Sequence, residues 1–575
     1  MITDQIQKLV ADAAKKIGIQ DKVEITIPSQ KQFGDFATNV SLKSAKHLNK
    51  KPVEIAEEIV KNIPENDLII EAKIIDPGFI NFWISPNVNF AAAKKIAKNI
   101  FEILPFRFGP EKKIMVEFAH PNTLKLLHIG HMRNLSTGEA VIRLLEATGN
   151  KVIRSNYQGD VGLHIAKTIW KIKQFFKETG KEKMEALSLR DKIALLGKAY
   201  AAAEKAFGEN ENAKKEILEV NKMVYEENPK IMPLWKETRE WSLQYFDEIY
   251  KRMYSHHDRL YFESEVYKRG TEIAKNLLEK GVLEKSQGAV VFNGKRHGVD
   301  TRVFINSQGF PTYEGKELGL AELEFSEFGA LDKNIHVVTP EQTSFFQVTF
   351  KVEELIDPTK YKDRQYHMAY NWVKLKSGKM SSRYGNVVEG AWLLDEAKKK
   401  LKEKYKLDED TAETFAVAAV KYSFLKVSPQ VEIFFDFDES VSLEGNSAPY
   451  LIYTYVRTQS VLNKNLKLKI LNLNSNSKFE VLNSKSNLTG EEKALLRKIS
   501  QYTTAVYEAT SRLSPNILTS YLFELAQDFN LFYQKNPILK AENNQKNTRL
   551  ILTVAVGNIM KHGLNLLGIK TVEKM

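Results

Sequence analysis

The chain has 575 residues, 43% of them apolar and 27% charged, and a formal net charge of +12. A chain of this length is too long to fold around one hydrophobic core, so several domains are expected. The apolar content excludes a chain that is disordered throughout. The sequence contains no cysteine, which excludes disulfides, thiolate metal sites and a cysteine nucleophile. It also lacks a signal-peptide pattern and any run of about 20 apolar residues, so we expect a cytoplasmic protein without membrane contact. The positive charge favours a polyanionic partner, although many basic proteins bind no nucleic acid.

Residues 1–105 are expected to form an N-terminal α+β domain, because apolar residues recur at helical spacing and then alternate as in strands. The expected helices lie around residues 6–10 and 52–60, and the expected strands at 72–75 and 79–84, with the turn Asp76-Pro77-Gly78 between them.

Residues 106–440 show the alternation of apolar strands and helices that is typical of a parallel, Rossmann-like sheet with crossover helices. Strands are expected at 114–118 and 151–155, each followed by a helix. A charged helical insertion at about 180–280 is predicted to split the sheet. We expect the sheet to resume with strands at 289–292, 300–305 and 335–338.

Residues 441–575 are predicted to form an all-helical domain. A polar Asn/Ser-rich stretch at 472–488 indicates a surface loop. Thr489 followed by Glu492 has the pattern of a capping box, which predicts that a helix restarts there.

The segment His128-Ile129-Gly130-His131 follows the first strand of the expected sheet, at the start of a helix. Ligands of parallel sheets bind at this edge, and a helix N-terminus attracts phosphates. Gly130 lets a flat adenine or ribose approach the backbone, and both histidines can face a triphosphate. Taken alone, such histidines are more often ordinary cap or surface residues.

A second segment, residues 376–386 (KSGKMSSRYGN), contains Lys379 and Arg383, which can reach a transferring phosphate. Alone it is also consistent with a solvated basic loop. Together and in this order, the two segments resemble the HIGH and KMSKS signatures of class I aminoacyl-tRNA synthetases. The resemblance implies that ATP with Mg²⁺ is bound and that no structural metal is needed. The implied ATP-binding residues are His128, Gly130, His131, Lys379, Met380 and Ser381, and the implied catalytic residues are His128, His131, Lys379 and Arg383.

Further segments resemble the arginyl-tRNA synthetases over nearly the whole chain. Residues 33–39 and 77–82 resemble the family's N-terminal domain, which packs on the outer corner of the tRNA. Residues 446–453 and 525–533 resemble its helical anticodon-binding domain, where aromatic side chains among cations can stack on bases. Most of these aromatics are individually also consistent with a hydrophobic core. The implied tRNA contacts are Phe79, Asn81, Tyr533 and Met575.

The family's arginine pocket corresponds, by this resemblance, to Glu117, Asn122, Tyr313, Glu317 and Gln342. Carboxylates can accept two hydrogen bonds from a guanidinium, so Glu117 and Glu317 are its expected partners. Asn122 and Gln342 suit the α-amino and carboxylate groups of the substrate, and Tyr313 adds a ring or a hydroxyl. An isolated glutamate at position 317 would also fit a solvent-facing helix residue. In the stretch 156–162 (NYQGDVG), Asp160 is expected either to cap the next helix or to contact a ligand.

Three positions depart from the family pattern. Glu317 stands where aspartate is usual, His120 where serine is common, and Ser382 in place of the second lysine of KMSKS. The last change means that one phosphate contact must come from elsewhere.

The resemblance implies an arginine–tRNA ligase that forms arginyl-adenylate from L-arginine and ATP and transfers arginine to the 3′-terminal ribose of tRNA(Arg). We expect it to be a monomer. It also implies that the tRNA must bind before arginine is activated. The alternatives are a class I lysyl enzyme, a nucleotidylyltransferase and a non-catalytic RNA-binding relative. The pocket residues disfavour the first, the helical domain the second, and the intact His128, His131 and Lys379 the third.

Overall fold

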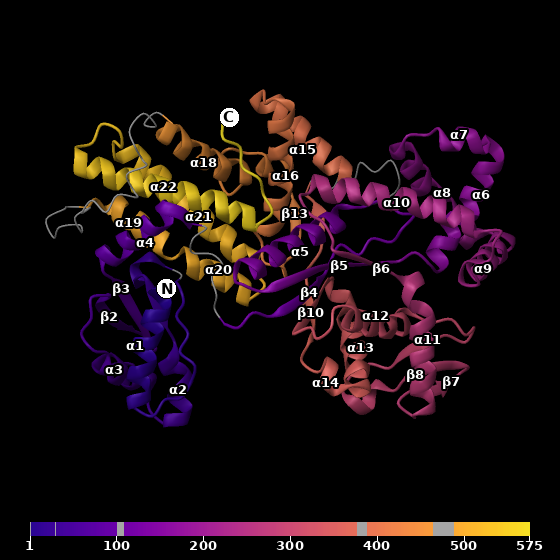
Figure 1. Cartoon of the computed structure of the whole chain (residues 1–575), viewed down its shortest axis with the longest axis horizontal. Helices are drawn as coiled ribbons and strands as arrows, with labels where there is room; N and C mark the ends of the chain where they lie inside the picture. The colour runs from indigo at the N-terminus through magenta and orange to yellow at the C-terminus, as the bar shows by residue number, and fades with distance from the viewer. Residues whose placement is uncertain (1, 29, 101–108, 377–387, 464–487, 575) are drawn as a thin grey trace. The chain divides into compact units, whose positions relative to one another are not determined.

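The computed structural model describes residues 2–28, 30–100, 109–376, 388–463 and 488–574. The chain forms two compact units, and Figure 1 follows it from the N-terminus to the C-terminus. The first unit contains residues 1–108, 442–566 and 570–575, and the second contains residues 109–441 and 567–569. Within the described ranges, no helix is long and apolar enough to cross a lipid bilayer.

The second unit is built on a five-stranded sheet in which every strand is parallel to its neighbours, in the order β11-β10-β4-β5-β6 (Figure 1). The expected Rossmann-like sheet is thus confirmed. Because β4 is the first of these strands in the chain and lies in the middle, the strand order reverses between β4 and β10, and ligands bind at the carboxyl ends of strands at such a point. The strands are β4 (Lys113–Glu117), β5 (Lys151–Gln158), β6 (Arg259–Phe262), β10 (Lys333–Val338) and β11 (Gln365–Ala369).

The two faces of this sheet are covered by different helices. Helix α5 (Ile129–Ala147) approaches so closely that a Cβ on Gly138 would lie 2.6 Å from the Phe118 side chain. Met115 instead packs in a core cluster with Phe325 of α12 (Tyr313–Glu327). Since successive side chains of a strand point to opposite faces, Glu117 shares the α12 face with Met115.

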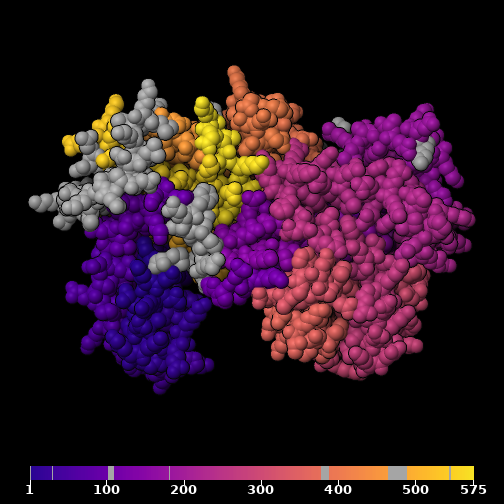
Figure 2. Space-filling model, in the orientation of Figure 1, coloured from indigo at the N-terminus to yellow at the C-terminus, as the bar shows by residue number. Residues whose placement is uncertain are grey.

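Helices follow β5 before the next strand of the sheet is reached: α6 (Leu163–Thr179), α7 (Lys181–Glu185), α8 (Leu189–Glu209), α9 (Glu211–Tyr225) and α10 (Met232–Arg252). In Figure 2 these helices are coloured from purple to magenta. Strand β6 also falls in the range 180–280 but pairs with β5 in the parallel sheet. Helix α11 (Glu263–Glu279) follows it directly.

The prediction that strands at 289–292 and 300–305 resume the parallel sheet is wrong. They are β8 (Ala289–Phe292) and β9 (Arg302–Ile305), which form a separate antiparallel sheet with β7 (Glu284–Ser286). The loop between β7 and β8 consists of Gln287 and Gly288, both with positive φ (47° and 79°). A loop of this length makes a hairpin, whereas parallel strands need a long crossover.

The remaining elements of the second unit follow β10 and β11. A short two-stranded parallel sheet joins β12 to β13. The elements are α13 (Thr343–Ile356), α14 (Pro358–Tyr361), β12 (Val373–Leu375), α15 (Gly390–Tyr405), α16 (Glu409–Leu425), β13 (Ile433–Phe435) and α17 (Phe437–Ser440).

The first unit combines an antiparallel sheet, in the order β1-β3-β2, with helices from both ends of the chain. The expected helices and strands of the N-terminal region are confirmed, and so is the capping box of Thr489 and Glu492. Of the polar stretch 472–488, residues 472–487 lie outside the described residues. The elements are α1 (Ile2–Lys16), β1 (Phe36–Thr38), α2 (Val40–Leu48), α3 (Pro52–Asn62), β2 (Ile69–Ile75), β3 (Phe79–Ile84), α4 (Pro86–Asn99), α18 (Ala448–Asn463), α19 (Gly490–Ser500), α20 (Tyr502–Ser511), α21 (Pro515–Lys535) and α22 (Asn543–Leu566).

Candidate active site

The loop between β4 and α5 has a strained backbone. Ala119, His120 and Leu124 have φ values of 77°, 49° and 62°, and each such residue costs about 1–3 kcal/mol that the surrounding structure must offset. Buried side chains of α5, β5 and α10 hold the loop by accepting its amide protons. Asn134 Oδ1 accepts from Ala119 N (2.7 Å), Asn156 Oδ1 from His120 N (3.1 Å) and Ser242 Oγ from Leu124 N (2.9 Å).

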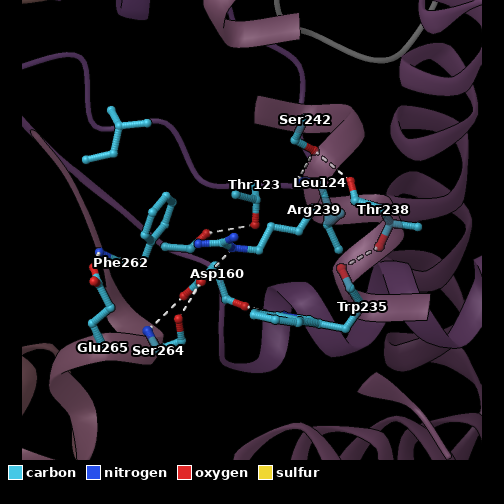
Figure 3. A network of polar contacts seen from close by, with 12 residues as sticks. Thr123, Leu124, Asp160, Trp235, Thr238, Arg239, Ser242, Phe262, Ser264 and Glu265 are labelled. Carbon is cyan, nitrogen blue, oxygen red and sulfur yellow. Dashed lines mark hydrogen bonds and ion pairs between the residues drawn. The ribbon is translucent and has the colours of Figure 1, made fainter. Parts of the chain in front are cut away.

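A second polar network beside this loop is centred on Asp160 (Figure 3). The Asp160 carboxylate accepts hydrogen bonds from the backbone and hydroxyl of Ser264 (2.8 and 2.7 Å) and from Arg239 Nε (2.9 Å). The indole of Trp235 donates to the Asp160 carbonyl at 2.7 Å. Helix α6 has Gly162, not Asp160, at its N-cap. Asp160 therefore ties the end of β5 to α10 and α11, which differs from the cap expected from the sequence.

The same network places Asn122. The amide of Thr123 donates to the Gly159 carbonyl at 2.9 Å, which brings the loop against the end of β5. A Cβ on Gly159 would lie 2.2 Å from Asn122 Oδ1. A side chain at position 159 would therefore displace the predicted substrate-binding amide.

The HIGH segment (residues 128–131) begins helix α5 with His128 as the N-cap. His128 Nδ1 accepts a hydrogen bond from Gly130 N, and His131 Nδ1 accepts one from His128 N, both at 3.1 Å. Because each Nδ1 is an acceptor, each Nε2 carries the proton in the neutral ring. Burial lowers the pKa of His128 to about 4 and that of His131 well below its usual value. The two rings, 3.8 Å apart between centroids, are therefore neutral donors rather than cations.

Hydrogen bonds connect the described residues before and after 377–387 to α5 and to the residues just before it. The amide of Ile129 donates to Val388 O (2.9 Å), and the amide of Gly390 donates to Leu127 O (2.8 Å). On the other side, the buried Arg133 guanidinium donates to the carbonyl of Trp372, just before β12, at 2.6 Å. The predicted residues Lys379, Met380, Ser381 and Arg383 lie outside the described residues, as does the departure Ser382.

Two of the predicted pocket residues, Glu117 and Glu317, are buried side chains at the carboxyl end of β4 and in the second turn of α12, 2% and 4% exposed. The alternative of a solvent-facing Glu317 is therefore wrong. Burial raises the pKa of both carboxyl groups. For Glu317 the charge of His336 opposes the shift, and those of Glu117 and Glu314 add to it. No hydrogen bond to the Glu317 carboxylate is found within the described part of the chain. A buried acceptor of this kind suits a cationic, multiply donating ligand.

Tyr313 and Gln342 are placed differently from the carboxyl groups. Tyr313 is the first residue of α12 and is 60% exposed, with Lys316 Nζ 5.3 Å from its ring centre. Gln342 is an exposed residue at the N-cap of α13, after the carboxyl end of β10. Both can therefore meet a ligand that enters from solvent.

The two described tRNA-binding candidates of the N-terminal sheet differ in exposure. Phe79 is 37% exposed, whereas Asn81 is 3% exposed and donates to the Phe33 carbonyl at 2.7 Å. In the stretch 33–39, Asp35 forms an ion pair with Arg497 of α19 and accepts from Ile84 N at 2.6 Å. Asp35 thus has a structural role inside the first unit.

A cluster of exposed aromatic rings surrounds Arg457 of α18, here called the Arg457 cluster (Tyr453, Arg457 and Tyr533). The guanidinium lies 4.7 Å from the Tyr453 ring centre and 5.1 Å from that of Tyr533. It donates to the Tyr453 hydroxyl (3.0 Å) and to Asn530 Oδ1 (2.5 Å). Tyr533 thus has partners that the sequence interpretation missed. The other C-terminal candidate, Met575, lies outside the described residues.

Several site residues escaped the sequence interpretation although a signal was present. Arg133 and Asn134 are polar residues in the second turn of α5, next to the apolar Met132 and Leu135, which indicates buried hydrogen bonding. Tyr453 and Arg457 are one helical turn apart, the spacing at which side chains on a helix meet. Asn156 and Ser242 had no comparable signal, because their partners are remote in the sequence.

The reversal point between β4 and β10, the histidine turn at the first crossover helix and the helical C-terminal region together define a class I aminoacyl-tRNA synthetase. Residues 103–437 match the family described as tRNA synthetases class I (R), catalytic domain. Residues 451–575 match the DALR anticodon binding domain, and residues 4–84 match the arginyl tRNA synthetase N terminal domain. The chain belongs to the arginyl-tRNA synthetase family.

Relatives support this membership over the full length. The arginine–tRNA ligase of Fusobacterium nucleatum is 30% identical, covering 100% of this chain and 99% of the relative, and that of Flavobacterium psychrophilum is 31% identical, covering 91% and 90%. The Thermus thermophilus arginyl-tRNA synthetase structure matches with a TM-score of 0.84 at 23% identity, covering all of both chains. The Plasmodium falciparum structure matches with a TM-score of 0.79 at 21% identity, over 100% of this chain and 99% of that one. The two structures share the fold of this chain.

Proposed function

We infer that the chain attaches L-arginine to tRNA(Arg) at the expense of ATP, releasing AMP and pyrophosphate. The specificity for arginine is inferred from the buried Glu317 carboxylate, which receives no hydrogen bond from the described residues. Glu317 lies on the face of the sheet that also holds Glu117. A guanidinium supplies the planar donors and the positive charge that such a site needs.

In this proposal, Glu317 and Glu117 face the guanidinium, and Tyr313 covers it with its ring or hydroxyl. Asn122, held against Gly159, and the exposed Gln342 bind the α-amino and carboxylate groups. The longer glutamate arm at position 317 would place its carboxylate one methylene further from α12 than aspartate would.

ATP is proposed to bind beside the HIGH segment. The Nε2–H groups of His128 and His131 donate to phosphate oxygens, and Gly130 leaves the backbone open to the nucleoside. Lys379 and Arg383 bind the pyrophosphate that leaves, and Met380 and Ser381 complete the nucleotide site. The Mg²⁺ that accompanies ATP neutralises phosphate charge. The described residues contain no group of three or more His, Asp or Glu side chains able to hold a metal, so the ion would be held chiefly by the phosphates.

The missing lysine at position 382 has a candidate replacement in Lys125. Its charge lowers the pKa of both His128 and His131, so it lies close to the histidines, and its ammonium is 4.3 Å from the Tyr200 ring centre. We propose that Lys125 contributes the phosphate contact that Ser382 cannot make.

Catalysis is proposed to proceed by positioning and charge stabilisation. An oxygen of the arginine carboxylate attacks the α-phosphorus, the bond from that phosphorus to the bridging oxygen breaks, and pyrophosphate leaves. The terminal ribose hydroxyl of the tRNA then attacks the acyl carbon, loses its proton, and AMP leaves. No side chain has to form a covalent bond.

The tRNA is proposed to meet the first unit. The Arg457 cluster offers exposed aromatic faces and a cation, which suit splayed bases and phosphates. Met575, outside the described residues, is proposed as a further base contact. Phe79 is the exposed candidate of the N-terminal sheet, whereas the buried Asn81 would act through its neighbours. We further propose a cytoplasmic monomer with domains at 1–105, 106–440 and 441–575.

An aminoacylation screen of all twenty amino acids against total tRNA tests the function. Charging with arginine alone is expected, and charging with lysine instead would favour the class I lysyl alternative. Arginine-dependent pyrophosphate exchange, measured with and without tRNA, tests whether activation needs the tRNA. Exchange that ignores added tRNA would contradict that requirement.

A further inference from the structure

More buried carboxyl groups lie near the proposed arginine pocket than one guanidinium needs as partners. Glu117 on β4, Glu317 and Glu324 on α12 and Glu353 on α13 are all at most 4% exposed. His336 of β10, fully buried, lies among them, and its charge opposes the rise in the pKa of Glu317 and of Glu324. Four ionised carboxylates in this place would be prohibitively costly, so some must hold protons.

The hydrogen bonds of His336 reveal its protonation. Its Nδ1 lies 3.1 Å from Glu117 Oε1, and its Nε2 lies 3.0 Å from Gln365 Oε1. Gln365 is oriented by its own amide, which donates to Glu353 Oε2 at 2.7 Å. A carboxylate and an amide oxygen are both acceptors, so in this arrangement a proton lies in each of the two bonds made by the imidazole.

A further proton is required between Glu117 and Glu324. The interaction between the two side chains lowers the pKa of Glu117 and raises that of Glu324, and two carboxyl groups can bond directly only through a shared proton. Glu117 Oε2 and Glu324 Oε1 are buried oxygens to which no N–H or hydroxyl of the described chain donates, so a carboxyl proton is what remains to join them. The other oxygen of Glu324 accepts from Asn334 Nδ2 at 2.7 Å.

The proton belongs on Glu324. Burial and the neighbouring Glu117 raise the pKa of Glu324 well above its usual value. Burial also raises the pKa of Glu117, but the hydrogen bond from Glu324 works in the opposite direction. Glu324 is thus the acid that donates, and Glu117 the carboxylate that accepts.

We propose that Glu117, Glu324 and His336 form a hydrogen-bonded triad without net charge. In this triad the protonated Glu324 positions Glu117. The negative charge that selects the guanidinium then comes from Glu317 alone. The three hydrogen bonds need three protons, and three protons shared by two carboxylates and an imidazolate give no net charge wherever each proton resides. Glu117 keeps free lone pairs and can still accept a guanidinium N–H. The proposal deepens the proposed function and rests on it for the identity of the ligand.

The other groups around the triad do not restore its charge. Burial raises the pKa of Glu353 well above its usual value, so it is a neutral acid. His120, whose Nδ1 is 3.6 Å from Glu117 Oε1, is neutral because burial lowers its pKa to about 4. Of the other titratable groups, Glu314 on α12 acts on Glu317 by its charge. The charges of the triad or of Glu317 in turn shift the pKa of Tyr157 on β5, Tyr261 on β6, Tyr361 on α14 and His367 on β11.

A pair of substitutions at position 324 tests the triad. In Glu324→Gln, the amide can donate to Glu117 and its oxygen can accept from Asn334, so the arginine KM should stay within about twofold of wild type. In Glu324→Met, the buried Glu117 oxygen loses its donor, and the arginine KM should rise roughly 10–100-fold while the ATP KM holds. Glu322→Gln is the matched control, because Glu322 lies on the same helix but pairs with Arg269 (2.6 Å) at the surface.

An infrared difference spectrum of the full-length enzyme without substrates gives a readout that does not depend on activity. The carbonyl absorption of buried carboxylic acids should be present near neutral pH. It should lose the contribution of one carboxyl group in Glu324→Gln, but not in Glu322→Gln. Loss of arginine affinity in Glu324→Gln, unchanged affinity in Glu324→Met, or an unaltered acid band would each overturn the triad. Failure to charge arginine at all would refute the proposed function instead, and the acid band would still report on Glu324.

Discussion

The proposed arginine pocket and the Arg457 cluster proposed to contact tRNA would recognise their ligands by opposite physical means. The pocket uses buried carboxyl groups such as Glu317, 4% exposed, where an unpaired charge is costly and a matching cation is strongly preferred. The Arg457 cluster uses rings such as Tyr533, 41% exposed, beside a guanidinium whose charge is screened by water. We therefore expect the selection of the amino acid to depend on individual polar atoms of the pocket. The free energy of tRNA binding, in contrast, should be distributed over several residues.

The largest effect of a single substitution on kcat/KM is expected at Glu317. Glu317→Gln removes the charged partner of a buried ion pair, which costs about 3–5 kcal/mol and lowers kcat/KM for arginine roughly 10²–10³-fold. Steady-state aminoacylation with varied arginine measures it, with Glu322→Gln as the control on the same helix. An arginine KM that does not change would remove Glu317 from the pocket.

The histidine turn should show a comparable loss in a different kinetic constant. His131→Ala removes a neutral N–H donor from the proposed phosphate site, which should lower kcat about 10²–10³-fold. Binding of tRNA, measured by filter retention, should be intact. His256→Ala, at a side chain 64% exposed, provides the control. Normal kcat in His131→Ala would contradict the ATP site.

At the exposed cluster, smaller effects are expected. Tyr533→Ala should weaken tRNA binding by about 1–3 kcal/mol if one base stacks on the ring, without changing pyrophosphate exchange at saturating tRNA. Leu531→Ala alters an exposed apolar residue of the same helix, 44% exposed, and should have little effect. Equal effects of the two substitutions would show that no base stacks on Tyr533.

The last prediction concerns the pH dependence of the arginine KM, which should come from Glu317 in the pocket. Burial raises the pKa of Glu317 to about 8, with the charge of His336 opposing and those of Glu117 and Glu314 adding to the shift. The guanidinium binds the ionised form, so the arginine KM should fall by up to about tenfold per pH unit as the pH rises toward 8, and then level off. The dependence should be absent in Glu317→Gln, and a KM that rises with pH would contradict it.

Much of the architecture could be predicted from local patterns. The alternation of strands and helices indicated the parallel sheet, and the helix start at His128 followed from its place after the first strand. The partners of β8 and β9 could not be predicted in the same way, because an apolar strand pattern does not specify which sheet the strand joins. The two-residue hairpin at Gln287 and Gly288 was the signal that was overlooked.

For the site, the sequence by itself determined which groups are present: two histidines at a helix start and glutamates at positions 117 and 317. Only the tertiary structure decided their chemical states. The protonation of Glu324, the neutrality of His128 and the strained loop after β4 all depend on burial and on contacts between residues far apart in the chain. A protonation state reflects the free energy of a charge in its surroundings, and these surroundings exist only once the chain has folded.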